Sequence, residues 1–142
     1  NISQMRQPTL ALFGKVLLPL EDQLRLIEPE DEIVPGLTAA NAFGHSAGHL
    51  VFHVESDGRK LVLLNDTTPH YVASFAHPEW HFSMDDDPVK AAETRRTILA
   101  ECAASQVPVI GFHLPFPSIG FVETREDGFE FRPATYQFQL RG

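Results

Sequence analysis

The chain has 142 residues, a formal net charge of −8, 43% hydrophobic residues and 21% charged residues, which is ordinary for one folded domain. The acidic balance and the lack of a basic patch argue against nucleic-acid binding, and no apolar run is long enough to cross a membrane. The single cysteine, Cys102, allows no internal disulfide, which leaves the compartment open because many exported proteins also lack disulfides. We expect a soluble chain and slightly favour the cytoplasm over export.

Residues 1–32 are interpreted as a lead-in segment. Its apolar stretch, 10–20, is interrupted by Gly14 and Pro19, and the acidic run 28–32 is typical of a solvated loop. The sequence starts without a methionine or a signal-like segment, which we interpret as the mark of a fragment or a processed product.

From Ile33 onward the pattern predicts strands. The first covers 37–43, and two β-rich runs then flank an Asp57-Gly58 pair that is typical of a tight hairpin turn. A second hairpin is predicted to turn at Asp127-Gly128. The two β-rich runs of the first hairpin are 50–55 and 60–65, and the second hairpin covers 121–132. Further strands are predicted at 107–114 and 136–140.

One main helix is predicted from Pro88 to about Gln106. Asp87 is suited to cap it, Pro88 suits its first turn, and the carboxylates of 85–87 favour its positive end, so this run is interpreted as capping. The predicted apolar stripe consists of Val89, Ala92, Leu99, Cys102 and Ala103. Cys102 is therefore interpreted as a small core residue.

Three candidate metal ligands lie beside the ends of predicted strands. His45 lies in a glycine-flanked turn before a strand, and Asp66 and His113 lie where two other strands end. Loops beyond strand ends are a common place for sites in layered α/β folds. Two imidazoles and one carboxylate suit Zn²⁺ or another divalent first-row metal. With seven histidines in the chain, this grouping is one of several alternatives.

A longer set of motifs resembles a known family. The segment Gly44-His45-Ser46-Ala47-Gly48-His49 resembles the GHTPGH segment of the metallo-β-lactamase superfamily, and Asp66 and His113 match its bridging aspartate and last histidine ligand. The closer resemblance is to the methyl parathion hydrolase-like branch, a relative of the N-acyl homoserine lactonases. It covers about 33–140 and rests on 34–36, the run 70–87, the helix 88–104 and 113–117.

The resemblance implies a fold and a site. The fold is α/β (α+β), half of an αβ/βα sandwich, with a mixed, mainly antiparallel sheet and one main helix on its outer face. His45 would ligate the first metal, His113 the second, and Asp66 would bridge both, with His49 in the supporting shell. A possible apolar substrate pocket would be lined by His70, Phe75, Trp80 and Phe116.

The family's HxHxDH motif, which supplies further ligands to both metals, does not occur in this sequence. We therefore expect 33–142 to be the C-terminal half of such a domain. The resemblance implies, for an intact protein, two divalent metal ions (zinc favoured) and hydrolysis of an ester, lactone or phosphoester bond in a small molecule by metal-activated water. Pro69, where lactonases tend to carry a tyrosine, counts against a lactone. Metal binding by this chain alone is expected to be weak or absent, and the chain inactive.

Two other functions stay open at this point. A cupin-like β-sandwich could hold one metal through His49, His53 and Glu55 on a single strand. A non-catalytic structural or interaction domain could retain the scaffold without the first ligand cluster. Because half of a sandwich exposes an apolar sheet face, we expect the chain to form a homo-oligomer or to pair with a missing N-terminal half.

Overall fold

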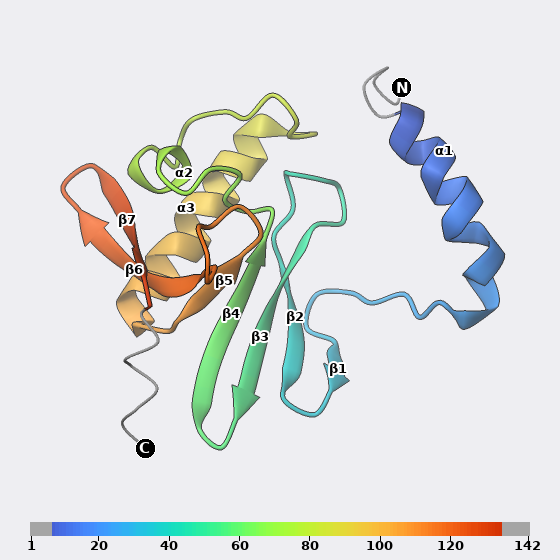
Figure 1. Ribbon diagram of the computed structural model, residues 1–142, viewed down its shortest axis with the longest axis horizontal. Helices are drawn as coiled ribbons and strands as arrows, with labels where there is room; N and C mark the ends of the chain where they lie inside the picture. The colour runs from blue at the N-terminus through green and yellow to red at the C-terminus, as the bar shows by residue number, and fades with distance from the viewer. Residues whose placement is uncertain (1–6, 135–142) are drawn as a thin grey trace.

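The computed structural model describes residues 7–134, which contain one seven-stranded sheet with the strand order β1-β2-β3-β4-β5-β6-β7 (Figure 1). All neighbouring strands are antiparallel except β4 and β5, which are parallel and are joined through the main helix. The strands are β1 (Glu32–Val34), β2 (Leu37–Asn41), β3 (Leu50–Ser56), β4 (Arg59–Asn65), β5 (Val109–Gly111), β6 (Ile119–Arg125) and β7 (Gly128–Pro133). The predicted fold class, a mixed and mainly antiparallel sheet with one main helix, is confirmed.

Within residues 7–134, four helical segments accompany the sheet. They are α1 (Gln7–Val16), the 3₁₀ helix η2 (Leu18–Gln23), the short α2 (Ala73–Ala76) and the main helix α3 (Pro88–Ser105). None of the helices within residues 7–134 is long and apolar enough to span a bilayer.

Both predicted hairpins form: the first turns at Asp57-Gly58, as predicted, whereas the second turns at Glu126-Asp127, one residue before the predicted Asp127-Gly128 pair. Asp57 and Gly58 both have positive φ, 51° and 72°, as a two-residue turn between strongly twisted strands requires. This turn fixes the register of β3 on β4, in which Phe52 faces Leu63. The last predicted strand, 136–140, lies outside the described residues.

Helix α3 begins as predicted, but its buried face differs from the predicted stripe. The Asp87 carboxylate accepts a hydrogen bond from the Lys90 backbone N–H at 2.9 Å, which caps the first turn. Val89 was expected in the core and is 58% exposed. The residues that α3 buries are Ala91, Ala92, Arg95, Ile98, Leu99, Cys102 and Ala103. A charged residue, Arg95, thus occupies a position that an apolar pattern would not predict.

The hydrophobic core lies between α3 and one face of the sheet. Leu64, Val109 and Val122 of β4, β5 and β6 are fully buried there, together with Leu99 of α3. Because successive strand residues point to opposite faces, the neighbours of these residues form the other face.

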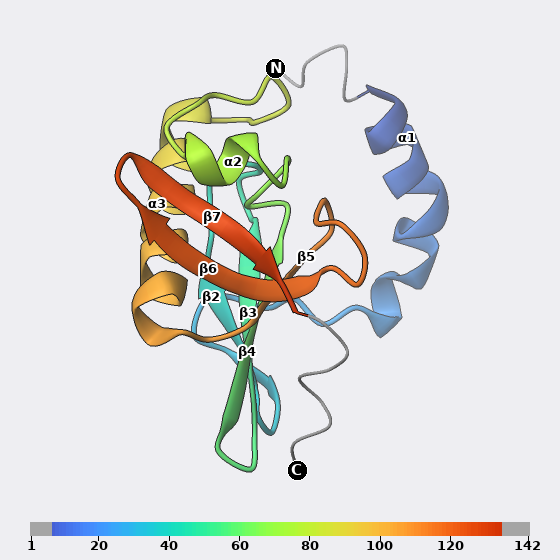
Figure 2. The same cartoon turned by 60° about the vertical axis from the view of Figure 1, so that its left-hand side comes forward.

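That other face carries a continuous apolar row across five strands. The cross-strand pairs join Ala39, Phe52, Leu63, Ile110 and Ile119 in one line. Ala39 is buried and the four larger side chains are half-buried. Figure 2 shows α3 on one side of the sheet and α1 standing off on the other. Strands that are apolar on both sides are typical of a sheet that is covered on both faces.

Residues 7–23 form helices, whereas the sequence suggested only an interrupted apolar lead-in. Gly14 lies inside α1 and Pro19 lies in the first turn of η2, where its missing N–H costs nothing. No residue of either helix is buried. Both helices carry large exposed apolar side chains, namely Leu10, Leu12, Phe13, Val16, Leu18 and Leu20.

The thiol of Cys102 is buried in the folded chain, and we expect it to react slowly there. Burial, with a smaller effect of neighbouring Glu101, raises the pKa of this thiol to about 12. At pH 8 the thiolate fraction is then about 10⁻⁴, against about 0.2 for an exposed cysteine. We expect labelling by a disulfide reagent at pH 8 to be about a thousandfold slower in the native chain than in denaturant. Fast native labelling would show that α3 does not cover the sheet as described.

Candidate metal centre

His45 lies in the tight connection between β2 and β3. The loop closes on itself through backbone bonds from Ala42 N to His49 O (3.0 Å) and from Gly44 N to Ser46 O (3.2 Å). Gly44 has φ +130°, and a Cβ atom there would lie 2.3 Å from the Ala91 backbone nitrogen. Only glycine allows the first turn of α3 to pack this closely against the loop. The glycine before His45 thus fixes the position of the loop on α3.

The imidazole of His45 is hydrogen-bonded to the buried carboxylate of Asp85. Its Nδ1 lies 2.9 Å from Asp85 Oδ1, and the Asp85 side chain is 1% exposed. With Nδ1 engaged by Asp85, Nε2 is the nitrogen through which His45 would ligate a metal. The interpretation of 85–87 as helix capping is therefore wrong for Asp85, which pairs with His45 and with Arg95 (3.4 Å), whereas Asp87 caps α3 as predicted.

Asp66 follows β4 directly and is turned toward His113. Asn65, which precedes it, has φ 50° and donates from Nδ2 to Leu50 O at 2.8 Å, so this residue supplies the left-handed backbone that ends the strand. His113 Nε2 lies 3.0 Å from Asp66 Oδ1. The two side chains are 50% and 34% exposed, respectively, so solvent reaches the pair.

His49 holds the backbone at Asp66. Its Nδ1 lies 2.9 Å from Ala42 O, and its Nε2 lies 3.2 Å from the Asp66 backbone nitrogen. Nδ1 therefore carries the proton and donates, while Nε2 accepts from the Asp66 N–H. Burial lowers the pKa of His49, and the bond to Ala42 opposes that shift. The neutral ring that this arrangement needs is thus the favoured form.

The four side chains come from loops at one end of the neighbouring strands β2, β3, β4 and β5. The ring centroids of His45 and His49 are 5.5 Å apart, His49 contacts Asp66, and Asp66 contacts His113. The donor types fit a divalent first-row metal, and a buried carboxylate behind a ligand histidine is a common feature of such sites. Even so, within residues 7–134 no group of three or more His, Cys, Asp or Glu side chains is arranged to hold a metal ion. The donor types suit a metal centre, but too few donors are grouped within the described residues to form a complete one.

The four residues suggested for a substrate pocket have different environments. Phe75 is 1% exposed and packs against Phe131 in the core, so it faces no open pocket. His70 Nδ1 accepts from the backbone N–H groups of Val72 and Ala73, at the start of α2. Trp80 is 57% exposed and stacks on His77, and Phe116 is 96% exposed.

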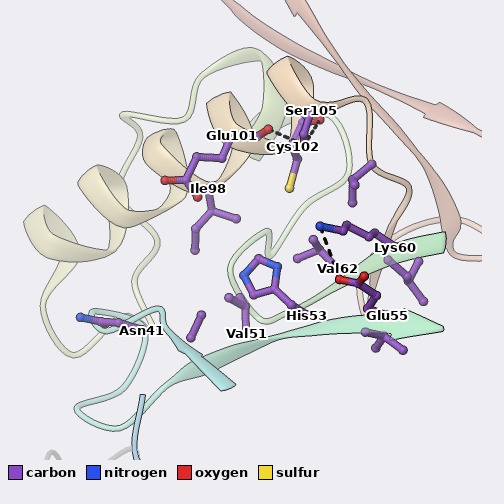
Figure 3. A pocket seen from close by; sticks show the side chains of 14 residues that line it. Asn41, Val51, His53, Glu55, Lys60, Val62, Ile98, Glu101, Cys102 and Ser105 are labelled. Carbon is purple, nitrogen blue, oxygen red and sulfur yellow. Dashed lines mark hydrogen bonds and ion pairs between the residues drawn. The ribbon is translucent and has the colours of Figure 1, made fainter. Parts of the chain in front are cut away.

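A pocket of about 380 Å³ lies elsewhere, between β3, β4 and α3 (Figure 3). His53 and an ion pair between Lys60 and Glu55 (3.4 Å) line it, together with Cys102. The cupin-like alternative required His49, His53 and Glu55 in a β-sandwich. The described strands form one sheet instead of two, and the partners of His49 are Ala42 and Asp66, which do not line this pocket. The sandwich interpretation is therefore wrong for this part of the chain.

Sequence reasoning missed two residues of the site, Asp85 and Arg95. Asp85 belonged to an acidic run that is also a good helix start, and Arg95 lies on a helix whose other charged residues are exposed. The only available signal was that Arg95 falls between the apolar positions Ala92 and Leu99.

Comparison with known proteins extends this picture. No protein-family model matches the chain, and no curated protein matches it in sequence. Among solved structures, AidC, a dizinc quorum-quenching lactonase in complex with its product, matches with a TM-score of 0.87 and 25% identity over 95% of this chain. The hydrolase AbOPH of the β-lactamase superfamily matches with a TM-score of 0.81 and 25% identity over 94% of the chain. A probable metal-dependent hydrolase from Staphylococcus aureus shares the fold, with a TM-score of 0.58.

The matched structures are about twice as long as this chain. It covers 46% of AidC, 48% of AbOPH and 42% of the S. aureus protein. The described residues therefore correspond to about half of the fold of these hydrolases.

Proposed function

Since this chain has half of a metallo-β-lactamase fold, as in the dizinc lactonase AidC and the hydrolase AbOPH, we propose that it is the C-terminal half of a two-metal hydrolase. His45 would ligate one metal ion, His113 the other, and Asp66 would bridge the two. The observation that carries this proposal is the contact of His113 with Asp66 at 3.0 Å, made between the ends of two adjacent parallel strands.

The number of donors supports a shared site rather than a self-sufficient one. A catalytic zinc normally takes three protein ligands and a water molecule. Three side chains divided over two metal ions leave each ion with two protein ligands. The remaining ligands would come from a segment that corresponds to the other half of the matched structures. Alone, this chain would bind metal weakly and would not catalyse hydrolysis.

The apolar face opposite α3 supports the same proposal. The row from Ala39 through Phe52 to Ile119 is the surface that a second half, or a second copy of the chain, would cover. At roughly 25 cal/mol per Å² of apolar surface, covering several half-buried aliphatic and aromatic side chains would stabilise such a pairing by several kcal/mol.

Bound divalent ions would lower the pKa of a water molecule and stabilise negative charge that develops on oxygen. The chain's own residues would hold these ions and keep the site fixed. Asp66 offers two carboxylate oxygens that solvent can reach, and His49 fixes the backbone of Asp66 by accepting a hydrogen bond from its N–H. Asp85 holds the Nδ1 side of His45, so its Nε2 would be presented to the metal.

The substrate would be a small molecule with a hydrolysable carbonyl or phosphoryl centre. AidC acts as a lactonase and AbOPH as a hydrolase, which makes a lactone, an ester and a phosphoester the first compounds to test. Trp80 and Phe116, both exposed, would offer apolar surface to such a substrate.

The test compares residues 1–142 with the longest natural polypeptide that carries this sequence. Both are assayed with zinc, cobalt or manganese against an N-acyl homoserine lactone, an aryl ester and an aryl phosphotriester. We expect metal-dependent turnover of at least one substrate by the longer protein and none by residues 1–142. Full activity of the 142-residue chain, or turnover by the longer protein that a chelator leaves unchanged, would contradict the proposal.

A further inference from the structure

Arg95 is a buried charge at the centre of the site's supporting structure. It lies in the second turn of α3 and is 2% exposed. Burying a guanidinium is costly unless its donors are hydrogen-bonded and its charge is paired. The partners of Arg95 therefore indicate what the fold gains from placing it there.

Four hydrogen bonds connect Arg95 to two irregular loops. Its Nε donates to Thr67 O at 2.9 Å, and its Nη1 donates to Pro78 O at 2.9 Å and to Trp80 O at 2.8 Å. Its Nη2 donates to Asp85 Oδ2 at 3.4 Å. The planar guanidinium can satisfy these divergent acceptors at once, which the single ammonium of a lysine cannot do.

Two of these bonds lead directly to candidate metal ligands. Thr67 is the residue after Asp66, so Arg95 fixes the peptide next to the proposed bridging carboxylate. The second oxygen of the Asp85 carboxylate bonds His45 Nδ1 at 2.9 Å. The Arg95 guanidinium is thus hydrogen-bonded to the residue that follows Asp66, and the Asp85 carboxylate links it to His45.

We propose that Arg95 and Asp85 are the positioning residues of the metal centre: Arg95 orients Asp85, Asp85 holds His45 in its Nδ1–H tautomer, and Arg95 fixes the loop that carries Asp66. The inference rests on the proposed function, because it takes His45 and Asp66 as the ligands. The hydrogen bond from His45 to Asp85 determines which nitrogen of the neutral ring is protonated. A carboxylate can only accept a hydrogen bond, so Nδ1 must carry the proton and the lone pair stays on Nε2.

An ordinary structural ion pair would make a different prediction. If Asp85 and Arg95 served stability alone, changing them would weaken folding and leave the response of His45 and Asp66 to zinc unaffected. The near-isosteric variant Asp85→Asn separates the two cases. Arg95 would attract the amide oxygen, and the amide NH₂ group would then face His45 Nδ1 and force the proton onto Nε2.

The experiment follows the imidazole nitrogens of His45 by ¹⁵N NMR in metal-free protein, and then the response of the same signals to zinc. We expect the Nδ1–H tautomer in the unaltered chain and the Nε2–H tautomer in Asp85→Asn. We also expect zinc affinity to fall about 10-fold to 100-fold in Asp85→Asn and in Arg95→Lys. The matched control is Arg96→Lys, because the Arg96 side chain is 63% exposed and pairs only loosely with Glu79, at 3.9 Å; it should change neither readout.

The outcomes separate this inference from the proposed function. An unchanged Nδ1–H tautomer in Asp85→Asn overturns the positioning role. A tautomer that switches as expected, in a chain whose His45 and Asp66 signals never respond to zinc, overturns the proposed function and leaves the Asp85–His45 contact as a structural one. If Arg95→Lys does not fold, Asp85→Asn decides the matter alone.

Discussion

Replacing Asp66 by asparagine is expected to abolish metal-dependent hydrolysis by the longest natural form of this protein, lowering kcat/KM by more than about 100-fold. Asp66 is the one donor that the proposal assigns to both metal ions, so both lose a charged ligand at once. The shape of the side chain is retained, and because the carboxylate is 34% exposed, its loss should leave folding nearly unchanged. Metal content by mass spectrometry, kcat/KM and thermal unfolding are measured together.

The matched control for Asp66→Asn is His53→Ala. His53 is also a potential ligand, but it lies on β3 and lines the pocket beside α3, away from the contacts of Asp66. It should keep the metal content and activity of the unaltered protein. If His53→Ala lost metal while Asp66→Asn retained it, the ligand assignment would be wrong.

Replacing Phe75 by alanine is expected to destabilise the chain by about 3–5 kcal/mol. Phe75 is 1% exposed and lies in the short α2, where it packs against Phe131 of β7. Truncation removes a large apolar side chain and leaves a cavity between these elements. The measurement is the free energy of unfolding from a urea titration, compared with that of the unaltered chain.

Phe116→Ala is the matched control for this core prediction. It makes the same chemical change at a side chain that is 96% exposed, and it should change the free energy of unfolding by less than about 0.5 kcal/mol. Equal losses in the two variants would show that Phe75 is not a core residue. A small loss at Phe75 alone would revive its interpretation as part of a substrate surface.

The sequence predicted well those elements that local chemistry determines. The Asp57-Gly58 turn and the Asp87 cap depend on residues within a few positions of one another, and both are present. The second hairpin is also present, but its turn lies at Glu126-Asp127, one residue before the predicted Asp127-Gly128 pair. By contrast, the strand predicted for 107–114 shortens to Val109–Gly111. Periodicity could not reveal this, because a turn that brings the Leu114 N–H to Gly111 O ends the strand.

The sequence predicted less well where long-range contacts override local preference. Val89 looked like a core residue and is exposed, because the first turn of α3 packs against the glycine loop through Ala91 instead. Arg95 was not part of the predicted apolar stripe and is buried, because carbonyl groups from distant loops converge on it. Only the three-dimensional arrangement brings those acceptors together.

The candidate ligands came from strand ends and from a family resemblance, and their contacts needed the structure. Spacing alone could not show that Asp66 meets His113, since 47 positions separate them. It also could not show that His45 is held by Asp85, a residue that looked like part of a helix start. The sequence could identify the candidate ligands, but it could not show which side chains they contact.

The most direct test of the central claim is a zinc titration of residues 1–142, followed residue by residue in NMR spectra. The proposed ligand set of His45, Asp66 and His113 predicts weak binding, with a dissociation constant of roughly 1 to 100 μM or higher, because each ion has two protein ligands instead of the usual three. It predicts that the affected signals are those of His45, Asp66 and His113, while His53 stays unchanged. Tight binding of a single ion centred on His53 and Glu55, or no response at His45, Asp66 and His113 up to millimolar zinc, would contradict it.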